Sequence, residues 1–401
     1  MDIFFSKPGV FCADGSNPAE IWISVTEGNQ SGIRRVKTAL SGEDFFAARI
    51  ADEKLKPSSS RYDMRIMRIE EETLVQIEAD IEKAKTKYGS ERVAVCVGSC
   101  DNGTEFSVAG HKVFFKEGKF AENYNLEIQG ADYVSTFISE KYGINGPACT
   151  FSTACSSSAG AIIKGAELIK SGMADAVIAG GIDIASDTVL IGFNSLEAVS
   201  SEITNPFSKN RHGITLGEAG AFFVLSREPL DDSIPCIKLK GFGESSDAYH
   251  MTSPDPTGDG AERAMRKALL TAGLEPKDID YINLHGTGTK FNDSMEAKAV
   301  DRIFGDYKVP VSTTKCETGH TLGAAGALEA AVCWFTLFEN LSKSNKNAKL
   351  PVQVWDGEQD SEMPVLNIVG KNTKVEKSEI RNCMSNSFAF GGANACLIIG
   401  L

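Results

Sequence analysis

The feature that most constrains the fold is a unit of helix, strand and glycine corner that occurs once in each half of the chain. In the first half, residues 63–87 carry apolar side chains at helical spacing and precede the strand-like "RVAVCVGSC". In the second half, the helical residues 262–276 precede "IDYINLHGTGT". A helix that begins with small residues follows each unit: "CSSSAGAIIKGAELIKSG" and "GHTLGAAGALEAAVCWF". The alternation predicts an α/β architecture, and the repetition indicates an internal duplication.

The two copies divide the chain into halves of domain size. The chain has 401 residues, of which 42% are hydrophobic, enough to build two cores. The polar segment between Pro229 and Pro235 is a plausible boundary, because it follows the strand-like "GEAGAFFVLS". We therefore expect an N-terminal half over residues 1–232 and a C-terminal half over residues 233–401.

Composition excludes several classes of partner. The net charge of −13 is opposite to that of a typical nucleic-acid binder. The N-terminus has no basic region before an apolar run, and the longest apolar stretch contains Glu329 and is too short to span a bilayer. Ten cysteines without a framework spacing are typical of reduced thiols. We expect a cytoplasmic protein without a nucleic-acid or membrane partner.

One cysteine lies among small residues, in "CTFSTACSSSAG" (149–160). An apolar face at helical spacing predicts a helix from about Ser156, which places Cys155 at its first turn. Free N–H groups and the helix dipole favour a thiolate there, and small neighbours would leave the sulfur reachable. The alternative is an inert, buried cysteine that fills a tight core.

Two of the five histidines lie in glycine-rich settings. His285 opens "HGTGT" after a strand, and His320 begins a helix in "KCETGHTLGAAGALEA". A helix N-terminus disfavours imidazolium, so we expect a neutral His320 that donates an N–H to an oxyanion or enolate. Lys315 and Glu329 flank it and would set the local charge. The alternatives are a strand cap for His285 and a satisfied core histidine for His320. No cysteine pairs at metal-ligand spacing accompany them, and we expect no metal.

The segment "NSFAFGGANACLI" (386–398) predicts a strand, a glycine corner and a second strand. Phe390 precedes Gly391 and Gly392, which favours a backbone N–H donor near the thiol and a ring that can swing. Two core aromatic residues before a hairpin are the alternative.

Together these segments resemble the β-ketoacyl-acyl carrier protein synthases of the thiolase superfamily, from about Ile33 to the C-terminus. The resemblance rests on six motifs in this order: "TACSSSAG", "NPFSKNRHGITLGEAGA", "DAYHMTSPDPTGDGA", "HGTGTKFND", "KCETGHTLGAAGALEA" and "NSFAFGGAN". It implies a thiolase-like α/β fold of two similar halves in a five-layer αβαβα sandwich. It also implies a dimer formed along a strand near the nucleophile, either a homodimer or a heterodimer with a related subunit.

The resemblance implies decarboxylative Claisen condensation with malonyl-acyl carrier protein. Cys155 would carry the acyl chain as a thioester, and His285 and His320 would assist malonyl decarboxylation and stabilise the enolate. Lys315 and Glu329 would hold the histidine network.

The remaining implied roles concern the oxyanion and the substrate arm. The backbone N–H groups of Cys155 and Phe390 would form the oxyanion hole, and the Phe390 ring would gate the pocket. Thr287 and Thr289 would bind the phosphopantetheine arm of acyl carrier protein, and Thr252 and Ser253 lie in the matching region of that channel. No cofactor would be bound, since the carrier protein brings the substrates.

Some residues depart from the pattern of the common fatty-acid enzymes. Glu197 occupies a position at which those enzymes are expected to have an arginine that helps to dock the carrier protein. His212 occupies a position at which they usually have an aspartate. The stretches "NPFSKNRHGITLGEAGAFFVLS" and "LPVQVWDGEQD" are more similar to synthases of aryl-polyene-type clusters. Four functions stay open: fatty acid elongation, polyene or polyketide synthesis, a non-catalytic partner subunit that would lack the nucleophile, and a thiol hydrolase.

Carrier proteins of this kind are acidic, and so is this chain, which means that docking requires a local basic patch. Arg61, Arg65 and Arg68 at the start of the first predicted helix are the candidates. The alternative is an ordinary solvated helix face.

Overall fold

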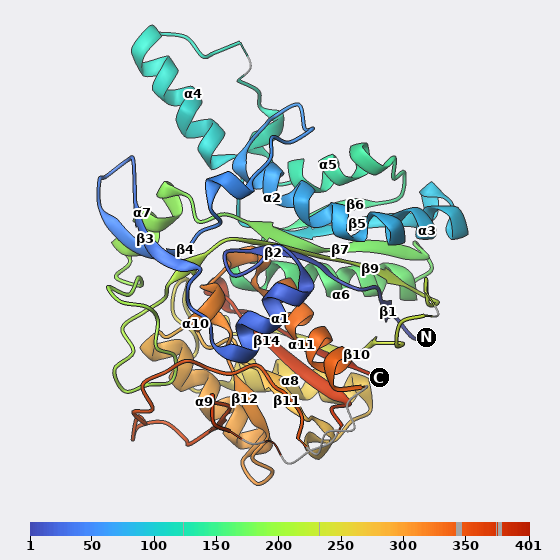
Figure 1. Ribbon diagram of the computed structural model, residues 1–401, viewed down its shortest axis with the longest axis vertical. Helices are drawn as coiled ribbons and strands as arrows, with labels where there is room; N and C mark the ends of the chain where they lie inside the picture. The colour runs from blue at the N-terminus through green and yellow to red at the C-terminus, as the bar shows by residue number, and fades with distance from the viewer. Residues whose placement is uncertain (123, 232, 342–346, 374, 376–378) are drawn as a thin grey trace.

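The computed structural model describes residues 1–122, 124–231, 233–341, 347–373, 375 and 379–401, which form an α/β fold around one large mixed sheet (Figure 1). Residue 232, the predicted boundary, lies outside the described residues, so the division into halves stays a prediction. The sheet runs in the order β13-β12-β11-β14-β15-β10-β1-β9-β7-β5-β6, and β2 pairs with β9.

The two parts of this sheet have the same order and strand directions. In the first part β6 and β7 lie parallel to β5, and β9 and then β2 follow antiparallel. In the second part β12 and β14 lie parallel to β11, and β15 and then β10 follow antiparallel. This correspondence supports the internal duplication. The strands are β2 (Gly9–Cys12), β5 (Val93–Gly98), β6 (Ala148–Phe151), β7 (Ala176–Asp183), β9 (Ala219–Ser226), β10 (Lys238–Ser246), β11 (Tyr281–Asn283), β12 (Pro310–Ser312), β14 (Asn382–Phe388) and β15 (Ala393–Gly400).

Helices cover the sheet in three layers, which gives the five-layer αβαβα sandwich that the family resemblance implied (Figure 1). One outer layer packs on β5, β7 and β9, and a central pair lies between the two parts of the sheet. The other outer layer packs on β10 and β15. In that order the layers hold α2 (Arg65–Leu74), α3 (Glu78–Tyr88) and α5 (Tyr133–Tyr142); α6 (Ser157–Lys170) and α11 (Ala325–Leu341); and α8 (Asp259–Ala272) and α9 (Lys290–Phe304).

The remaining elements connect these layers. A short strand, β1, joins β9 to β10, and β13 lies at the far edge. A three-stranded sheet of β3, β4 and β8 lies apart, and α4 projects from the body (Figure 1). Their bounds are β1 (Phe4–Phe5), β3 (Ile33–Lys37), β4 (Asp44–Ala48), β8 (Leu216–Gly217), β13 (Asn367–Ile368), α1 (Pro18–Glu27), α4 (Thr104–Glu117), α7 (Asp187–Ser195) and α10 (Lys315–Thr318).

Two predictions about helices need correction. The segment 63–87 is not one helix, because a 3₁₀ turn at Val75–Ile77 separates α2 from α3 while the apolar residues at helical spacing stay buried. The apolar segment around Glu329 is not too short for a membrane: the helical stretch Leu322–Leu341 is long and apolar enough to cross one. However, 89% of its most apolar window is buried inside the protein, so its composition reflects its place between the sheet layers.

Candidate active site

Cys155 lies on the tight turn between β6 and α6. The strand ends at Phe151, a 3₁₀ turn covers Ala154–Ser156, and α6 begins at Ser157. Ala154 has a φ of +49°, a left-handed conformation that costs energy for a residue with a side chain. The turn places the thiol at the N-terminal end of the helix, on the wall of a cavity.

The small residues around Cys155 are explained by close backbone packing. A Cβ added to Gly98 would lie 2.2 Å from the backbone nitrogen of Ser158, and one on Gly181 would lie 2.5 Å from the Ser158 Cβ. A Cβ on Gly326 of α11 would lie 2.8 Å from the Ala159 Cβ. The first turn of α6 is therefore wedged between β5, β7 and α11. The sequence analysis explained the small residues by access to the sulfur, whereas these contacts show that tight packing of the helix also requires them.

Both candidate histidines lie beside the thiol. His320 Nε2 is 3.0 Å from Cys155 Sγ. The His285 ring is 5.4 Å from the His320 ring, at 86° to it. The three side chains are buried, and their ligand-type atoms lie within 4.8 Å of one another. The turn after β6, the end of β11 and the residues before α11 thus bring the three predicted residues into one cluster.

Burial controls the protonation of this cluster. It lowers the pKa of His320 well below the usual value, and the charge of Lys315 lowers it further, so the imidazole is neutral at pH 7 as predicted. Burial and Lys315 do the same to the pKa of His285.

The expected resting thiolate is wrong. Burial raises the pKa of Cys155 to about 11, although Lys315 and the backbone N–H of Phe390 act in the opposite direction. A protonated thiol beside a neutral imidazole is ready to pass its proton to His320 as the sulfur attacks.

Lys315 and Glu329 form a buried ion pair behind the histidines. The ammonium group of Lys315, on α10, donates to Glu329 Oε1 on α11, and both side chains are almost completely buried. Burial raises the pKa of Glu329 to about 7 in spite of the neighbouring ammonium group. The ammonium group of Lys315 supplies the positive charge that helps to keep both imidazoles neutral.

Replacing Lys315 with methionine is expected to move the acidic limb of the pH–rate profile to higher pH. The positive charge lowers the pKa of His320, so its removal raises that pKa and protonates the imidazole at a higher pH. The check is the rate of Cys155 alkylation and acylation between pH 5 and 8. Lys209→Met, at an exposed ion pair with Glu358, is the control and should leave the profile unchanged. An acidic limb that stays in place in Lys315→Met would contradict this role.

The sequence analysis predicted no metal ion, and the active-site cluster itself is the place to examine that prediction. Within the described ranges, Cys155, His285 and His320 form the group that could hold a metal ion through one sulfur and two nitrogen atoms. The charge of Lys315 opposes a divalent cation at this point, because it already disfavours a single proton on either imidazole.

Two carboxylates that the sequence analysis missed hold the loop of His285. Glu296 accepts the backbone N–H groups of His285 and Gly286, each at 2.8 Å. One helical turn earlier, Asp293 accepts the N–H of Thr287 at 3.1 Å. The available signal was an acidic pair at i, i+3 on the helix that follows "HGTGT".

One cavity of about 490 Å³ collects most of the predicted residues. The hydroxyl oxygens of Thr287 and Thr289 are 3.1 Å apart on its wall. Glu197 and His212, the two departures from the common pattern, lie on the same wall. The predicted site residues that line the cavity are Cys155, Thr252, Ser253, His285, Thr287, Thr289, His320 and Phe390.

Phe390 lies on a glycine corner beside the thiol. Its backbone N–H acts to lower the pKa of the Cys155 thiol, and its ring stacks on Phe193 with the centroids 5.9 Å apart. Gly391 and Gly392 have φ values of +82° and +77°, which residues with side chains rarely adopt. The corner brings both an N–H donor and an aromatic ring to the cavity.

The three candidate docking arginines do not form a free basic patch. Arg65 points inward and pairs with the fully buried Glu218. Arg68 pairs with Asp63 at 2.7 Å. Arg61 pairs with Glu127 at 3.3 Å and Glu140 at 2.8 Å. None of the three is among the lining residues of the Cys155 cavity. The prediction for Arg65 is wrong because its charge compensates a buried carboxylate, and Arg61 and Arg68 stay candidates with partly neutralised charge.

Replacing Arg65 with methionine is therefore expected to destabilise the fold by about 3–5 kcal/mol, because the buried Glu218 loses its partner. Chemical denaturation measures the free energy of unfolding. Arg68→Met is the matched control: it breaks a half-exposed pair and should cost less than about 1 kcal/mol. Equal losses in the two variants would contradict the structural role of Arg65.

The fold and the Cys–His–His cluster define a thiolase-fold condensing enzyme. Residues 9–230 match the β-ketoacyl synthase N-terminal domain, and residues 237–348 match its C-terminal domain. The chain belongs to the β-ketoacyl synthase family, as an acyltransferase of the type that condenses acyl chains.

Individual relatives point to two branches of this family. The chain is 36% identical over 324 residues to 3-oxoacyl-[acyl-carrier-protein] synthase 2 of Coxiella burnetii, which covers 77% of this chain and 75% of that protein. The ketosynthase ApeO in complex with its chain length factor ApeC, from Xenorhabdus doucetiae, has a TM-score of 0.89 at 38% identity, with 100% of this chain and 98% of that chain covered. The ishigamide ketosynthase/chain length factor has a TM-score of 0.87 at 28% identity, with the same coverage.

Proposed function

We propose that the protein catalyses the decarboxylative Claisen condensation of an acyl chain held on Cys155 with malonyl-acyl carrier protein. The observation that carries this proposal is the 3.0 Å contact between Cys155 Sγ and His320 Nε2, with a second neutral histidine beside it. A nucleophile and two N–H donors in one cavity are what the two half-reactions require.

The first half-reaction loads the acyl chain. The Cys155 thiol passes its proton to His320 while the sulfur attacks the thioester carbonyl of the incoming acyl group. The backbone N–H groups of Cys155 and Phe390 stabilise the negative oxygen of the tetrahedral intermediate. The proton then leaves with the thiol of the carrier arm, and His320 is neutral again.

The second half-reaction builds the carbon–carbon bond. Malonyl thioester loses carbon dioxide, and the N–H groups of His285 and His320 hold the negative charge on the enolate oxygen. The enolate carbon attacks the acyl carbonyl, the bond to Cys155 Sγ breaks, and the leaving thiolate takes up a proton from water. Loss of carbon dioxide supplies the carbanion, so no strong base is needed.

Fatty acid elongation is the main pathway assignment, and the 36% identity to a protein named 3-oxoacyl-[acyl-carrier-protein] synthase 2 supports the condensing reaction that it requires. Aryl-polyene-type synthesis is the second candidate. It is supported by 38% identity to the ketosynthase ApeO, with 100% of this chain covered. A non-catalytic partner subunit is disfavoured, because Cys155 and both histidines are present and in contact.

We propose that acyl carrier protein delivers both substrates on its phosphopantetheine arm, without any resident cofactor. The cavity that leads to Cys155 presents the hydroxyl groups of Thr287 and Thr289, with Thr252 and Ser253 also on its wall. Hydroxyl groups in this position suit the amide groups of such an arm. We also propose a cytoplasmic location, supported by the ten cysteines, all of which are free.

We propose a dimer that pairs across β6, with a second copy or a related subunit. Among the residues that the structure describes, strand β6 ends the sheet with one unpaired edge, and Ala148 on it is exposed. Ala148→Lys is expected to shift the species seen by light scattering from dimer to monomer, because a lysine on an edge strand blocks pairing. Met173→Lys, at an exposed residue after α6, is the control and should stay dimeric. A dimer that survives Ala148→Lys would contradict pairing across this edge.

Incubation with an acyl carrier thioester and malonyl carrier tests the proposed function. The expected product is a 3-oxoacyl carrier two carbons longer than the acyl substrate, with release of carbon dioxide. Aryl and saturated acyl substrates distinguish the two pathways. Free acid without a condensed product would indicate a thiol hydrolase and overturn the proposal.

A further inference from the structure

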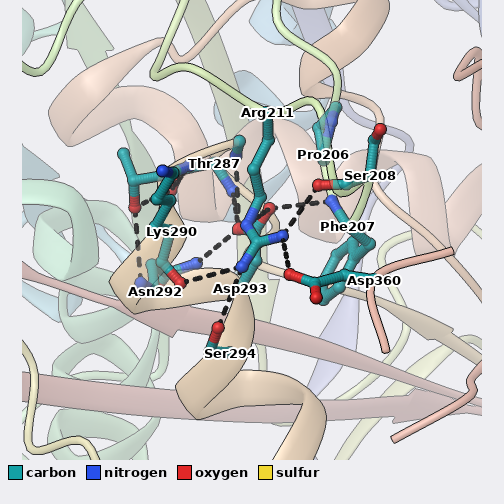
Figure 2. A network of polar contacts seen from close by, with 12 residues as sticks. Pro206, Phe207, Ser208, Arg211, Thr287, Lys290, Asn292, Asp293, Ser294 and Asp360 are labelled. Carbon is teal, nitrogen blue, oxygen red and sulfur yellow. Dashed lines mark hydrogen bonds and ion pairs between the residues drawn. The ribbon is translucent and has the colours of Figure 1, made fainter. Parts of the chain in front are cut away.

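A buried arginine joins the segment 356–360 to the first turn of α9, as Figure 2 shows. Nη1 of Arg211 donates to Asp360 Oδ2 at 2.6 Å and to the Ser208 carbonyl at 2.7 Å. Nη2 donates to Ser294 Oγ at 2.9 Å and to the Lys290 carbonyl at 3.3 Å. The guanidinium thus clamps three separate stretches of chain together.

The start of α9 carries the two threonines proposed to bind the substrate arm. Thr289 is the N-cap residue of the helix and accepts the backbone N–H of Asn292 at 3.3 Å. Asp293 Oδ1 accepts the N–H groups of Thr287 and Gly288 at 3.1 and 3.2 Å. Any shift of this first turn therefore moves both threonine hydroxyl groups relative to Cys155.

Asp360 balances the charge of Arg211 within this network (Figure 2). Arg211 Nε has no hydrogen-bond acceptor in the described part of the chain and lies 4.0 Å from Asp293 Oδ2, the oxygen that accepts the Phe207 N–H at 2.8 Å. Without the charge of Asp360, Arg211 is attracted more strongly to Asp293. It then competes for the carboxylate that holds Thr287.

The other two acids of the segment do not contact Arg211. Asp356 accepts from Asn205, Ser208 and Asn210, and Glu358 pairs with Lys209 in an ion pair in which both side chains are about half exposed. The guanidinium holds the pKa of Asp360 below its usual range, so this carboxylate is charged at neutral pH.

We propose that Asp360 is a positioning residue for the carrier arm. Through Arg211 it fixes the start of α9 so that Thr287 and Thr289 meet the phosphopantetheine. Arg211 lines the cavity, and Asp360 is not among its lining residues, so it acts only through the arginine. The inference rests on the proposed function, which brings the arm to this cavity.

The test compares acylation of Cys155 by an acyl-pantetheine thioester in the full-length protein and its variants. Asp360→Asn is expected to raise KM roughly tenfold while kcat stays within about twofold of wild type. The reason is that a shift of Thr287 and Thr289 weakens binding of the arm more than it slows the reaction at the Cys155 sulfur. Alkylation of Cys155 by iodoacetamide, which needs no arm, should keep its wild-type rate. Asp360→Glu, which restores the charge, should recover most of the KM.

Glu358→Ala is the matched control, because it removes one acidic charge from the same segment without touching Arg211. It should leave KM, kcat and alkylation unchanged. An unchanged KM in Asp360→Asn would overturn the inference, and so would parallel losses of kcat and alkylation, which mark general structural damage. Absence of acylation in the wild-type protein would instead reject the proposed function.

Discussion

Replacing Cys155 with alanine is expected to lower the condensation rate by at least about a thousandfold, because the variant cannot form the acyl thioester that the enolate attacks. Malonyl decarboxylation should persist in part, since both histidines remain in place. The measurement is the rate of 3-oxoacyl product formation, with carbon dioxide release followed separately.

Cys100→Ala is the matched control for this variant. Cys100 follows β5, and its sulfur donates to the Ala154 carbonyl at 3.4 Å, so it contacts the turn that carries the nucleophile. Near-normal condensation is expected. Loss of product in Cys100→Ala together with normal activity in Cys155→Ala would reverse the assignment of the nucleophile.

The second large effect separates the two histidines. His285→Ala is expected to lower condensation by roughly 10²–10⁴-fold while acylation of Cys155 stays within a few-fold of wild type. The reason is geometric: His320 contacts the thiol at 3.0 Å, whereas His285 contacts the His320 ring and supplies the second donor to the enolate. Single-turnover acylation and full condensation, measured on the same preparation, distinguish the two steps.

His320→Ala should slow both steps, because it removes the proton acceptor of the thiol and one enolate donor. Circular dichroism checks that each variant keeps its fold, since both side chains are buried. Equal loss of acylation in the two histidine variants would contradict this division of labour.

Much of the fold and of the residues in the site was predictable from the sequence. The repeated unit predicted an α/β duplication, and the two parts of the sheet indeed share one strand order. Cys155, His285 and His320 each follow a strand or begin a helix beside glycines, and these chain ends meet in one cavity. Their catalytic roles stay proposals until the variants are measured.

The wrong and missed predictions concern contacts between distant parts of the chain and the depth of burial, which a single sequence does not show. The spacing along the start of the predicted helix grouped Arg65 with Arg61 and Arg68 as a docking patch, but Arg65 pairs with Glu218, 153 positions away in the chain. The thiolate was expected from the helix N-terminus alone, whereas the depth of burial raises the pKa of Cys155 to about 11. Asp293 and Glu296 were missed because their acceptor role appears only when the loop of His285 folds over the start of α9.

The central claim is that Cys155 carries the acyl chain, and the most direct measurement is peptide mapping after incubation with an acyl carrier thioester. The account predicts one acyl group per chain, located on the peptide that contains Cys155 and removed when malonyl carrier is added. An acyl group on any of the other nine cysteines, or one on Cys155 that malonyl carrier leaves in place, would contradict it.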